Sequence, residues 1–181
     1  MDVAIVPLNE ERLPLFPTSH TPFPVIGRLV PKYDGMHWSV SEELLSTPLE
    51  KTYPDESFDP ADYIDCPDRA AFLALMGEDC VGMVRLCRNW NQNALIEDLE
   101  IKPAFRRRGI GARLMDAAAD WSRRQGLRGM MLETQDWNLM ACRFYLRYGF
   151  VLGGLDSLLY AHSPYHKETA LFFYLALEDG K

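Results

Sequence analysis

The sequence predicts an α/β fold in which flanking helices cover a mixed, mostly antiparallel sheet. Three β-prone runs, at residues 71–76, 80–88 and 94–101, are joined by short turns and therefore predict an antiparallel meander. Apolar residues then recur at helical spacing over 111–125, and a buried strand follows at 129–134. This strand-helix-strand order predicts a right-handed crossover between two parallel strands at the centre of the sheet.

The elements before residue 70 are indicated less clearly. Residues 3–8 are predicted as a first strand, and the prolines that follow interrupt regular structure. Ser41 can cap a short helix over 41–49, because two glutamates fall in its first turn. An acidic connection is expected over 51–68, with a helical turn after Pro60.

The elements after residue 125 are indicated by glycines and by periodicity. Gly126 ends the first long helix, and a second helix over 138–148 ends at Gly149. The last two strands are expected at 150–155 and 169–177. Together these elements predict the order strands, helix, strand, helix, strands.

Composition fits one globular domain over residues 1–181, since 48% of the residues are hydrophobic and 25% are charged. The net charge of -7 argues against nucleic acid as a partner and suits a cationic substrate. No apolar run is long enough for a membrane span, and no secretion signal is recognisable at the N-terminus. We therefore expect a soluble, cytoplasmic protein without a membrane partner.

The cysteines and histidines predict no metal site. The cysteines form no C-x-x-C pair and have no metal-ligand spacing to the histidines, which favours isolated thiols over a disulfide framework or zinc. These residues are Cys66, Cys80, Cys87, Cys142, His20, His37, His162 and His166.

The most informative motif is Arg106-x-x-Gly109-x-Gly111, which lies between a predicted strand and a predicted helix. Backbone N–H groups at a helix N-terminus have no intrahelical partner, so they can converge on a phosphate where glycines leave room. The motif lacks the Gly-Lys-Ser/Thr of a P-loop and the third glycine of a dinucleotide fold. It predicts a pyrophosphate cradle, although an ordinary strand-to-helix turn is the simpler alternative.

This motif, followed by a second one at 138–150, resembles the coenzyme A motifs of the GNAT superfamily of N-acetyltransferases. In that fold two neighbouring parallel strands splay apart and leave a slot for the cofactor. Further segments over about residues 25 to 177 are similar to the streptothricin acetyltransferase family: 25–29, 51–53, 89–91, 96–98, 132–135, 153–156 and 168–170. The resemblance implies a variable N-terminal part at 1–69, a cofactor-binding core at 70–177, and acetyl-CoA as cofactor.

The resemblance also implies which residues hold acetyl-CoA. The backbone of Leu99 and Ile101 would pair with the pantetheine arm, and amides of the glycine turn would bind the pyrophosphate. Charge from Arg106, Arg108 and Arg113 would add to this, unless these are ordinary surface arginines. The full implied set is Leu99, Ile101, Arg106, Arg107, Arg108, Gly109, Ile110, Gly111, Ala112, Asn138, Ala141 and Tyr145.

Three residues of the second helix have both a structural and a functional interpretation. Asn138 is a favourable N-cap and can also contact pantetheine, while Ala141 lets the cofactor approach the helix. Tyr145 could pack in the core, but its position resembles the GNAT tyrosine that gives a proton to the leaving thiolate. We favour the proton-donor role for Tyr145.

An ammonium substrate must lose a proton before it attacks the thioester, so a carboxylate is expected near the strand ends. Glu133 resembles a base position used by some N-acetyltransferases, and Glu97 and Asp98 are expected to bind the cation. Because successive strand residues face opposite sides, at most one of Glu97 and Asp98 should line the slot deeply, unless a bulge turns both. For Glu100 a structural role is expected, and His162 and His166 are weaker candidates in a substrate loop.

The function that these features predict is direct acetyl transfer from acetyl-CoA to a small cationic amine. A streptothricin-type antibiotic, acetylated on its β-lysine amino group to give resistance, is the leading substrate by resemblance. The alternatives are an acetyltransferase for protein lysines, protein N-termini or polyamines, and a non-catalytic acyl-CoA sensor. A homodimer is an open expectation, because dimers are frequent in the superfamily.

Overall fold

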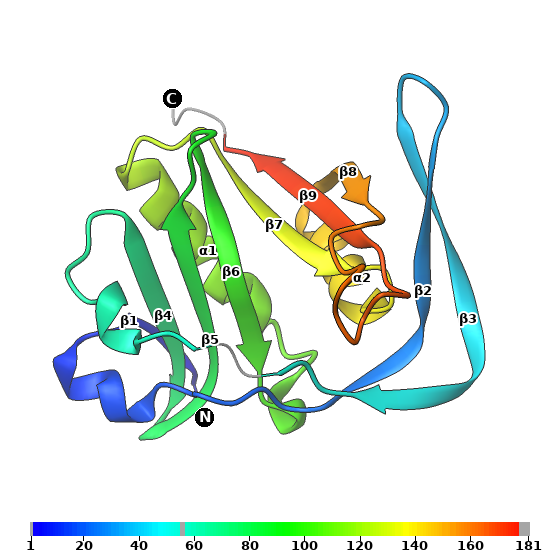
Figure 1. Cartoon of the computed structure of the whole chain (residues 1–181). Coiled ribbons are helices and arrows are strands. Elements are labelled where there is room, and N and C mark those ends of the chain that lie inside the picture. Colours follow the sequence, from blue (N-terminus) through cyan, green and yellow to red (C-terminus); the bar gives the residue numbers. More distant parts are fainter. Residues whose placement is uncertain (1, 55–56, 178–181) are drawn as a thin grey trace. The chain divides into compact units, whose positions relative to one another are not determined.

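The computed structural model describes residues 2–54 and 57–177, which form two compact units (Figure 1). The first unit contains the described residues of 1–21, 52–130 and 176–181. The second contains 22–51 and 131–175. The expectation of one domain over the whole chain stays a prediction.

The first unit is built on four antiparallel strands in the order β1-β4-β5-β6 (Figure 1). Their bounds are β1 Ala4–Pro7, β4 Arg69–Met76, β5 Asp79–Arg88 and β6 Asn93–Ile101. The predicted meander and first strand are thus confirmed to within a few residues. The turn between β4 and β5 contains Gly77 at φ 65°, a left-handed conformation that glycine adopts without strain.

The helices of the first unit pack on its sheet. The long helix α1, Ile110–Arg124, contacts β4, β5 and β6 through an apolar stripe that includes the fully buried Leu114, Met115 and Ala118. Two short 3-10 helices, η1 Glu10–Leu15 and η2 Pro60–Tyr63, contribute to a second cluster. The buried residues of this cluster are Leu8, Phe16, Tyr63, Ala71, Leu73, Cys80 and Met83, and the partly buried Leu13 and Leu15 of η1 pack against them. The expected turn after Pro60 is confirmed, whereas η1 was not expected.

The second unit contains most of β7 Gly129–Gln135, β9 Ala170–Ala176 and the whole of β8 Val151–Asp156, in the order β7-β9-β8. Helix α2, Leu139–Tyr148, ends at Gly149, whose φ of 117° confirms the expected glycine cap. None of the helices within the described residues is long and apolar enough to cross a membrane.

The expectation of a helix over 41–49 is wrong. These residues belong to β3 Trp38–Lys51, which pairs with β2 Phe23–Tyr33 in a long two-stranded ribbon (Figure 1). Pro48 would interrupt a helix, and the antiparallel partner instead supplies hydrogen bonds along the strand. Each strand of a two-stranded sheet has an unpaired edge, so this ribbon also tolerates the prolines that hid β2 in the sequence.

Asp136, which lies just before α2, connects three segments of the second unit by hydrogen bonds. Its backbone accepts a hydrogen bond from Leu29 N (2.9 Å) on β2 and donates one to Thr169 O (2.9 Å). Its carboxylate accepts from Thr169 N (2.9 Å). Asp136 is 4% exposed, and burial raises the pKa of its carboxyl group. One residue therefore joins β2 to the segments before α2 and β9.

Candidate active site

The predicted phosphate cradle has the backbone geometry of a helix start built without a side-chain cap. Gly109 is the N-cap of α1 at φ 79°, Arg107 also has a positive φ of 60°, and the first helical bond runs from Arg113 N to Gly109 O (3.2 Å). The amides of Ile110 and the next two residues therefore have no acceptor within α1. A Cβ at Gly109 would have no atom within 4 Å, so the space beside the turn is open. These features fit a bound pyrophosphate.

The arginines of this turn have different contacts. Arg106 donates from Nε to Ile101 O (2.8 Å) and from Nη2 to Thr21 Oγ1 (3.1 Å), so its guanidinium holds the turn to the end of β6. Arg107 and Arg108 are exposed, and Arg108 lies over the Phe105 ring at 5.4 Å. Arg107 and Arg108 are thus better placed than Arg106 to meet a ligand from solvent.

Strand β6 presents the residues expected at the pantetheine arm. Leu99 is opposite Val84 and Ile101 is opposite Gly82 in the pairing with β5. Gly82 permits this approach, because a Cβ there would lie 2.6 Å from Ile101 Cδ1 and 2.8 Å from Glu100 O. The pairing of Leu99 and Ile101 with a cofactor stays a prediction.

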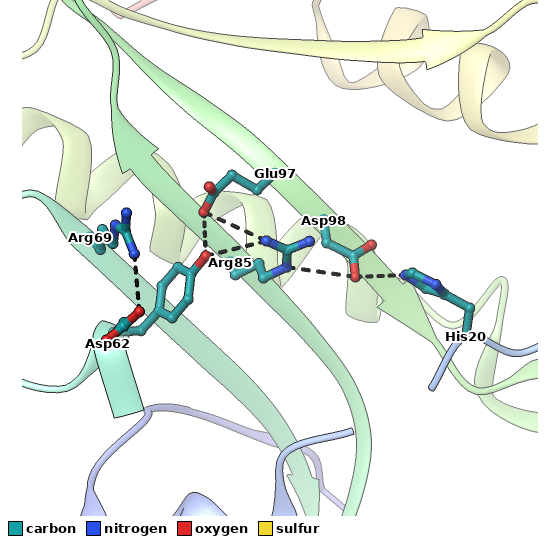
Figure 2. Close-up of polar contacts among 7 residues, drawn as sticks. His20, Asp62, Arg69, Arg85, Glu97 and Asp98 are labelled. Carbon is teal, nitrogen blue, oxygen red and sulfur yellow. Dashed lines mark hydrogen bonds and ion pairs between the residues drawn. The ribbon is translucent and has the colours of Figure 1, made fainter. Parts of the chain in front are cut away.

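A bulge in β6 turns both candidate substrate carboxylates toward one side. The register runs from Arg85 opposite Asp98 to Leu86 opposite Ile96, so Glu97 has no partner of its own on β5. Both carboxylates reach the Arg85 guanidinium, at 3.9 Å for Glu97 and 4.0 Å for Asp98 (Figure 2). The sequence predicted that Glu97 and Asp98 face opposite sides unless a bulge turns both, and the structure contains such a bulge.

Each carboxylate of this bulge also has a partner of its own. Tyr63 Oη donates to Glu97 Oε2 (2.7 Å) and accepts from Arg85 Nη1 (3.2 Å). His20 Nε2 lies 3.2 Å from Asp98 Oδ2 (Figure 2). Arg85 is 4% exposed and its guanidinium lies 4.3 Å from the centre of the Phe58 ring.

Sequence reasoning missed Arg85, Tyr63 and His20. Arg85 had a readable signal, because it is the charged residue in an otherwise apolar run of β5. Tyr63 and His20 had none, since they lie 34 and 78 residues from their partners.

The surroundings fix the protonation of these partners near neutral pH. The hydrogen bond with Asp98 raises the pKa of His20 from 6.5 to about 9, and the charges of Asp98 and Glu100 add to this against the effect of burial. Burial and the hydrogen bond to Glu97 raise the pKa of Tyr63 to about 12. His20 is therefore a cation and Tyr63 a neutral donor. Burial also raises the pKa of the nearby Cys87 thiol to about 11, which argues against a thiolate nucleophile there.

Glu100 has the structural role expected for it. One of its carboxylate oxygens accepts from both Thr21 N (2.6 Å) and Thr21 Oγ1 (2.5 Å). Together with the contact between Arg106 and Thr21, this binds the segment before β2 to the end of β6.

In the second unit, Glu133 on β7 accepts a hydrogen bond from Tyr160 Oη. The same hydroxyl accepts from Gln135 Nε2 (3.0 Å), and residues 133 and 135 share a face of β7 because side chains alternate along a strand. Tyr160 lies in the segment between β8 and β9, which also contains the weaker candidates His162 and His166. Both histidines are exposed there. Among residues 2–54 and 57–177, no group of three His, Cys, Asp or Glu side chains could hold a metal ion.

Helix α2 positions the remaining candidates. Asn138 is its N-cap and accepts from Ala141 N (3.3 Å), which confirms the capping role. Tyr145 is 8% exposed, with ring centres of Phe144, Phe150 and Phe173 at 5.4, 5.8 and 6.1 Å. A tyrosine in this position packs through its ring, and its hydroxyl group is a candidate proton donor.

The first unit thus combines the cradle with Glu97 and Asp98, and the second combines Glu133 with Asn138, Ala141 and Tyr145. Chemically, these groups can bind a phosphate anion, hold or deprotonate an ammonium group, and donate a proton from a phenol. This is the set that a transfer reaction to an amine requires.

Comparison with known proteins gives concordant results. Residues 38–150 match the acetyltransferase (GNAT) family model. The chain is 37% identical to streptothricin acetyltransferase A of Bacillus subtilis (strain 168) over 159 residues, which is 88% of this chain and 91% of that protein. It is 34% identical to a streptothricin acetyltransferase of Streptomyces lavendulae over 143 residues, 76% of each chain.

A solved structure is similar over almost the whole chain. It is a candidate streptothricin acetyltransferase from Bacillus anthracis str. Ames, crystallised with acetyl coenzyme A. The TM-score is 0.89 at 33% identity, covering 98% of this chain and 100% of that one. The similarity confirms the predicted fold class, a mixed sheet of mostly antiparallel strands with one parallel pair and flanking helices.

Proposed function

This chain belongs to the GNAT acetyltransferase family and, within it, to the streptothricin acetyltransferases, and on that premise we propose that it acetylates a streptothricin-type antibiotic. It is an acyltransferase whose acyl donor is acetyl-CoA. The proposed acceptor is the amino group of the antibiotic's β-lysine, and the proposed consequence is resistance. The observation that carries the proposal is the 37% identity to the Bacillus subtilis enzyme over nearly the full length of both chains.

The residues present fit acetyl-CoA. The open turn at Gly109 and the first amides of α1 would hold the pyrophosphate, with charge from the exposed Arg107 and Arg108. The backbone of Leu99 and Ile101 and the region of Asn138 and Ala141 would hold the pantetheine arm. When bound, acetyl-CoA supplies an acetyl group already activated as a thioester.

Two protons must be moved during the reaction, and the chain has a candidate for each. Glu133 is proposed to accept the proton that the substrate ammonium loses, directly or through water, with a carboxylate of the β6 bulge as the alternative base. Tyr145 Oη is proposed to hold the proton that the leaving sulfur requires. Because the thioester is already reactive, no covalent enzyme intermediate is needed, and the residues act by positioning and proton transfer.

Glu97 and Asp98 are proposed to bind the cationic part of the substrate. The bulge supports this role, because it directs both carboxylates to the same side of β6. The Glu97 side chain is 22% exposed and the Asp98 side chain is 16% exposed. A partly buried carboxylate attracts an ammonium group more strongly than one in bulk water, since the interaction is less screened.

The test is a substrate panel assayed by release of free thiol from acetyl-CoA. Streptothricin is expected to give the highest kcat/KM, and mass spectrometry of the product is expected to place the acetyl group on β-lysine. Spermidine, lysine, an aminoglycoside and a lysine peptide serve as competing acceptors. Higher kcat/KM with the peptide or polyamine would favour the alternative acetyltransferases, and thiol release with none of them would favour an acyl-CoA sensor.

Resistance and dimer formation are tested by separate measurements. Expression in a streptothricin-sensitive bacterium is expected to raise the inhibitory concentration of the antibiotic. Light scattering of the purified protein tests the expected homodimer.

A further inference from the structure

The two carboxylates of the β6 bulge are held by three side chains from three different parts of the first unit. Tyr63 lies at the end of η2, Arg85 on β5, and His20 in the segment that precedes β2. All three side chains belong to one network of contacts, which Figure 2 shows running from Glu97 through Arg85 and Asp98 to His20.

The network compensates the repulsion between the two carboxylates that the bulge brings to one side of β6. Glu97 and Asp98 are adjacent in sequence and turned to one side, so their negative charges repel each other. Arg85 lies between them, but its nearest approaches of 3.9 and 4.0 Å are longer than hydrogen bonds. At these distances Arg85 contributes positive charge to both carboxylates.

Direction comes from the two remaining residues, each of which contacts one carboxylate. Tyr63 Oη donates to Glu97 at 2.7 Å and is itself oriented by Arg85 at 3.2 Å. His20 Nε2 lies 3.2 Å from Asp98. The His20 and Asp98 side chains are 25% and 16% exposed, and both line a small surface hollow together with Phe58 and Met83.

We propose that Tyr63 and His20 are positioning residues for substrate recognition, Tyr63 acting through Glu97 and His20 acting through Asp98. The inference rests on the proposed role of these two carboxylates in binding the cationic substrate. Neither Tyr63 nor His20 needs to touch the substrate, because each fixes one oxygen of its carboxylate and so sets the direction of the other.

The protonation of His20 connects this arrangement to pH. Among the described residues, the charged groups that face it include Asp98 and Glu100 on β6, with Arg85 behind Asp98 and Arg106 behind Glu100 through Thr21. Because the pKa of His20 is raised to about 9, its bond to Asp98 is charge-assisted at neutral pH and weakens as pH rises through that value.

The first experiment is a double-mutant cycle on Tyr63 and Glu97. Tyr63→Phe keeps the ring and is expected to lower kcat/KM for streptothricin about tenfold, mainly through KM, the size expected for a hydrogen bond to a charged group. In a Glu97→Gln background the same change is expected to have less than a twofold effect, because the carboxylate it orients is gone. Tyr33→Phe, which removes a hydroxyl bonded to Gly35 O (2.9 Å) in the β2–β3 turn, is the matched control.

The second experiment uses pH as well as mutation. The ratio of kcat/KM between wild type and His20→Gln is expected to be about tenfold at pH 7.5 and to fall toward one above pH 9.5, since wild-type His20 then loses its charge. Taking the ratio cancels the titration of the substrate amine. His20→Gln is expected to have little effect in an Asp98→Asn background, and His37→Gln, an exposed histidine, is the control.

The outcomes separate this inference from the proposed function. Wild-type kcat/KM in Glu97→Gln and Asp98→Asn would remove the substrate-binding role itself, and the positioning role with it. Losses in those two variants, combined with equal effects of Tyr63→Phe or His20→Gln in both backgrounds or with a ratio that does not change with pH, would overturn the positioning role alone. Failure of Tyr63→Phe to fold, judged by circular dichroism, would likewise assign that hydroxyl to stability.

Discussion

Tyr145 contacts Phe144, Phe150 and Phe173 through its ring, so packing does not require its hydroxyl. Tyr145→Phe is therefore expected to keep stability and coenzyme A affinity while turnover falls about 10²-fold or more, as for a positioned proton donor. Thiol release measures turnover, and calorimetry measures coenzyme A binding. Tyr148→Phe on the same helix is the control. Normal turnover of Tyr145→Phe would mean that the ring only packs and that solvent supplies the proton.

Glu133 and the bulge carboxylates are expected to differ in how their loss depends on pH. Glu133→Gln should lower the rate most near and below neutral pH, where the amine is protonated, with partial recovery at higher pH. Glu97→Gln and Asp98→Asn should chiefly raise KM, as loss of uniform binding does. A pH-rate profile of each variant measures this, with Glu78→Gln in the exposed turn before β5 as control. If Glu133→Gln keeps the wild-type profile while a β6 variant flattens it, the base lies on β6.

At the scale of elements, the turn before α1 permits a matched comparison of strain and binding. Gly109 at φ 79° and Gly77 at φ 65° both have open space where a Cβ would be placed. Valine at either position is expected to cost about 1–2 kcal/mol of folding free energy, because a left-handed backbone is unfavourable for it. Only Gly109→Val should also weaken coenzyme A binding, since it adds a side chain beside the proposed cradle.

Chemical denaturation measures the free energy of unfolding of the two variants, and calorimetry measures their coenzyme A affinity. Equal coenzyme A affinity in Gly109→Val and Gly77→Val would remove this turn from the cofactor site.

The long β2–β3 ribbon shows why local signals misled at 41–49. Ser41, Glu42 and Glu43 resemble a helix start, but in the ribbon Glu43 forms an ion pair with Arg28 (2.7 Å) and Glu42 with Arg143 of α2. These partners lie 15 and 101 residues away in the sequence. Pairing across strands therefore decided an element that the capping signals alone predicted wrongly.

For the whole molecule, the His20–Asp98 pair predicts a pH dependence of stability. The pKa of His20 is about 9 in the folded chain and 6.5 as the reference value, so folding favours the protonated form. Its contribution is fully present below pH 6.5 and is lost as pH rises through about 9. The melting temperature of wild type is thus expected to exceed that of His20→Gln at pH 6 and to approach it at pH 9.5.

Using the difference between the two proteins cancels the titration of all other groups. His37→Gln should show no such convergence. A melting-temperature difference between wild type and His20→Gln that stays constant across this pH range would mean that Asp98 does not raise the pKa of His20.

The parts of the candidate site that depend on short-range sequence patterns could be predicted from the sequence. The glycine turn at Gly109, the cap at Asn138 and the periodicity of α1 depend on backbone conformation and on neighbours within a few positions. Those signals predicted the cradle and the cap of the second helix, whereas the roles of Tyr145 and Glu133 came from the resemblance to the GNAT superfamily. The family comparisons confirmed the predicted fold class.

The sequence by itself therefore determined the order of most elements, the family and the kinds of chemical groups available to it. The tertiary structure decided that the β6 bulge turns Glu97 and Asp98 to one side, that Tyr63, Arg85 and His20 hold them, and that residues 38–51 form a strand. The physical reason is the separation in sequence between the residues that interact. Helix caps and turns are fixed by dihedral preferences of adjacent residues, whereas a strand register and a buried ion pair depend on partners tens of residues away, which only folding brings into contact.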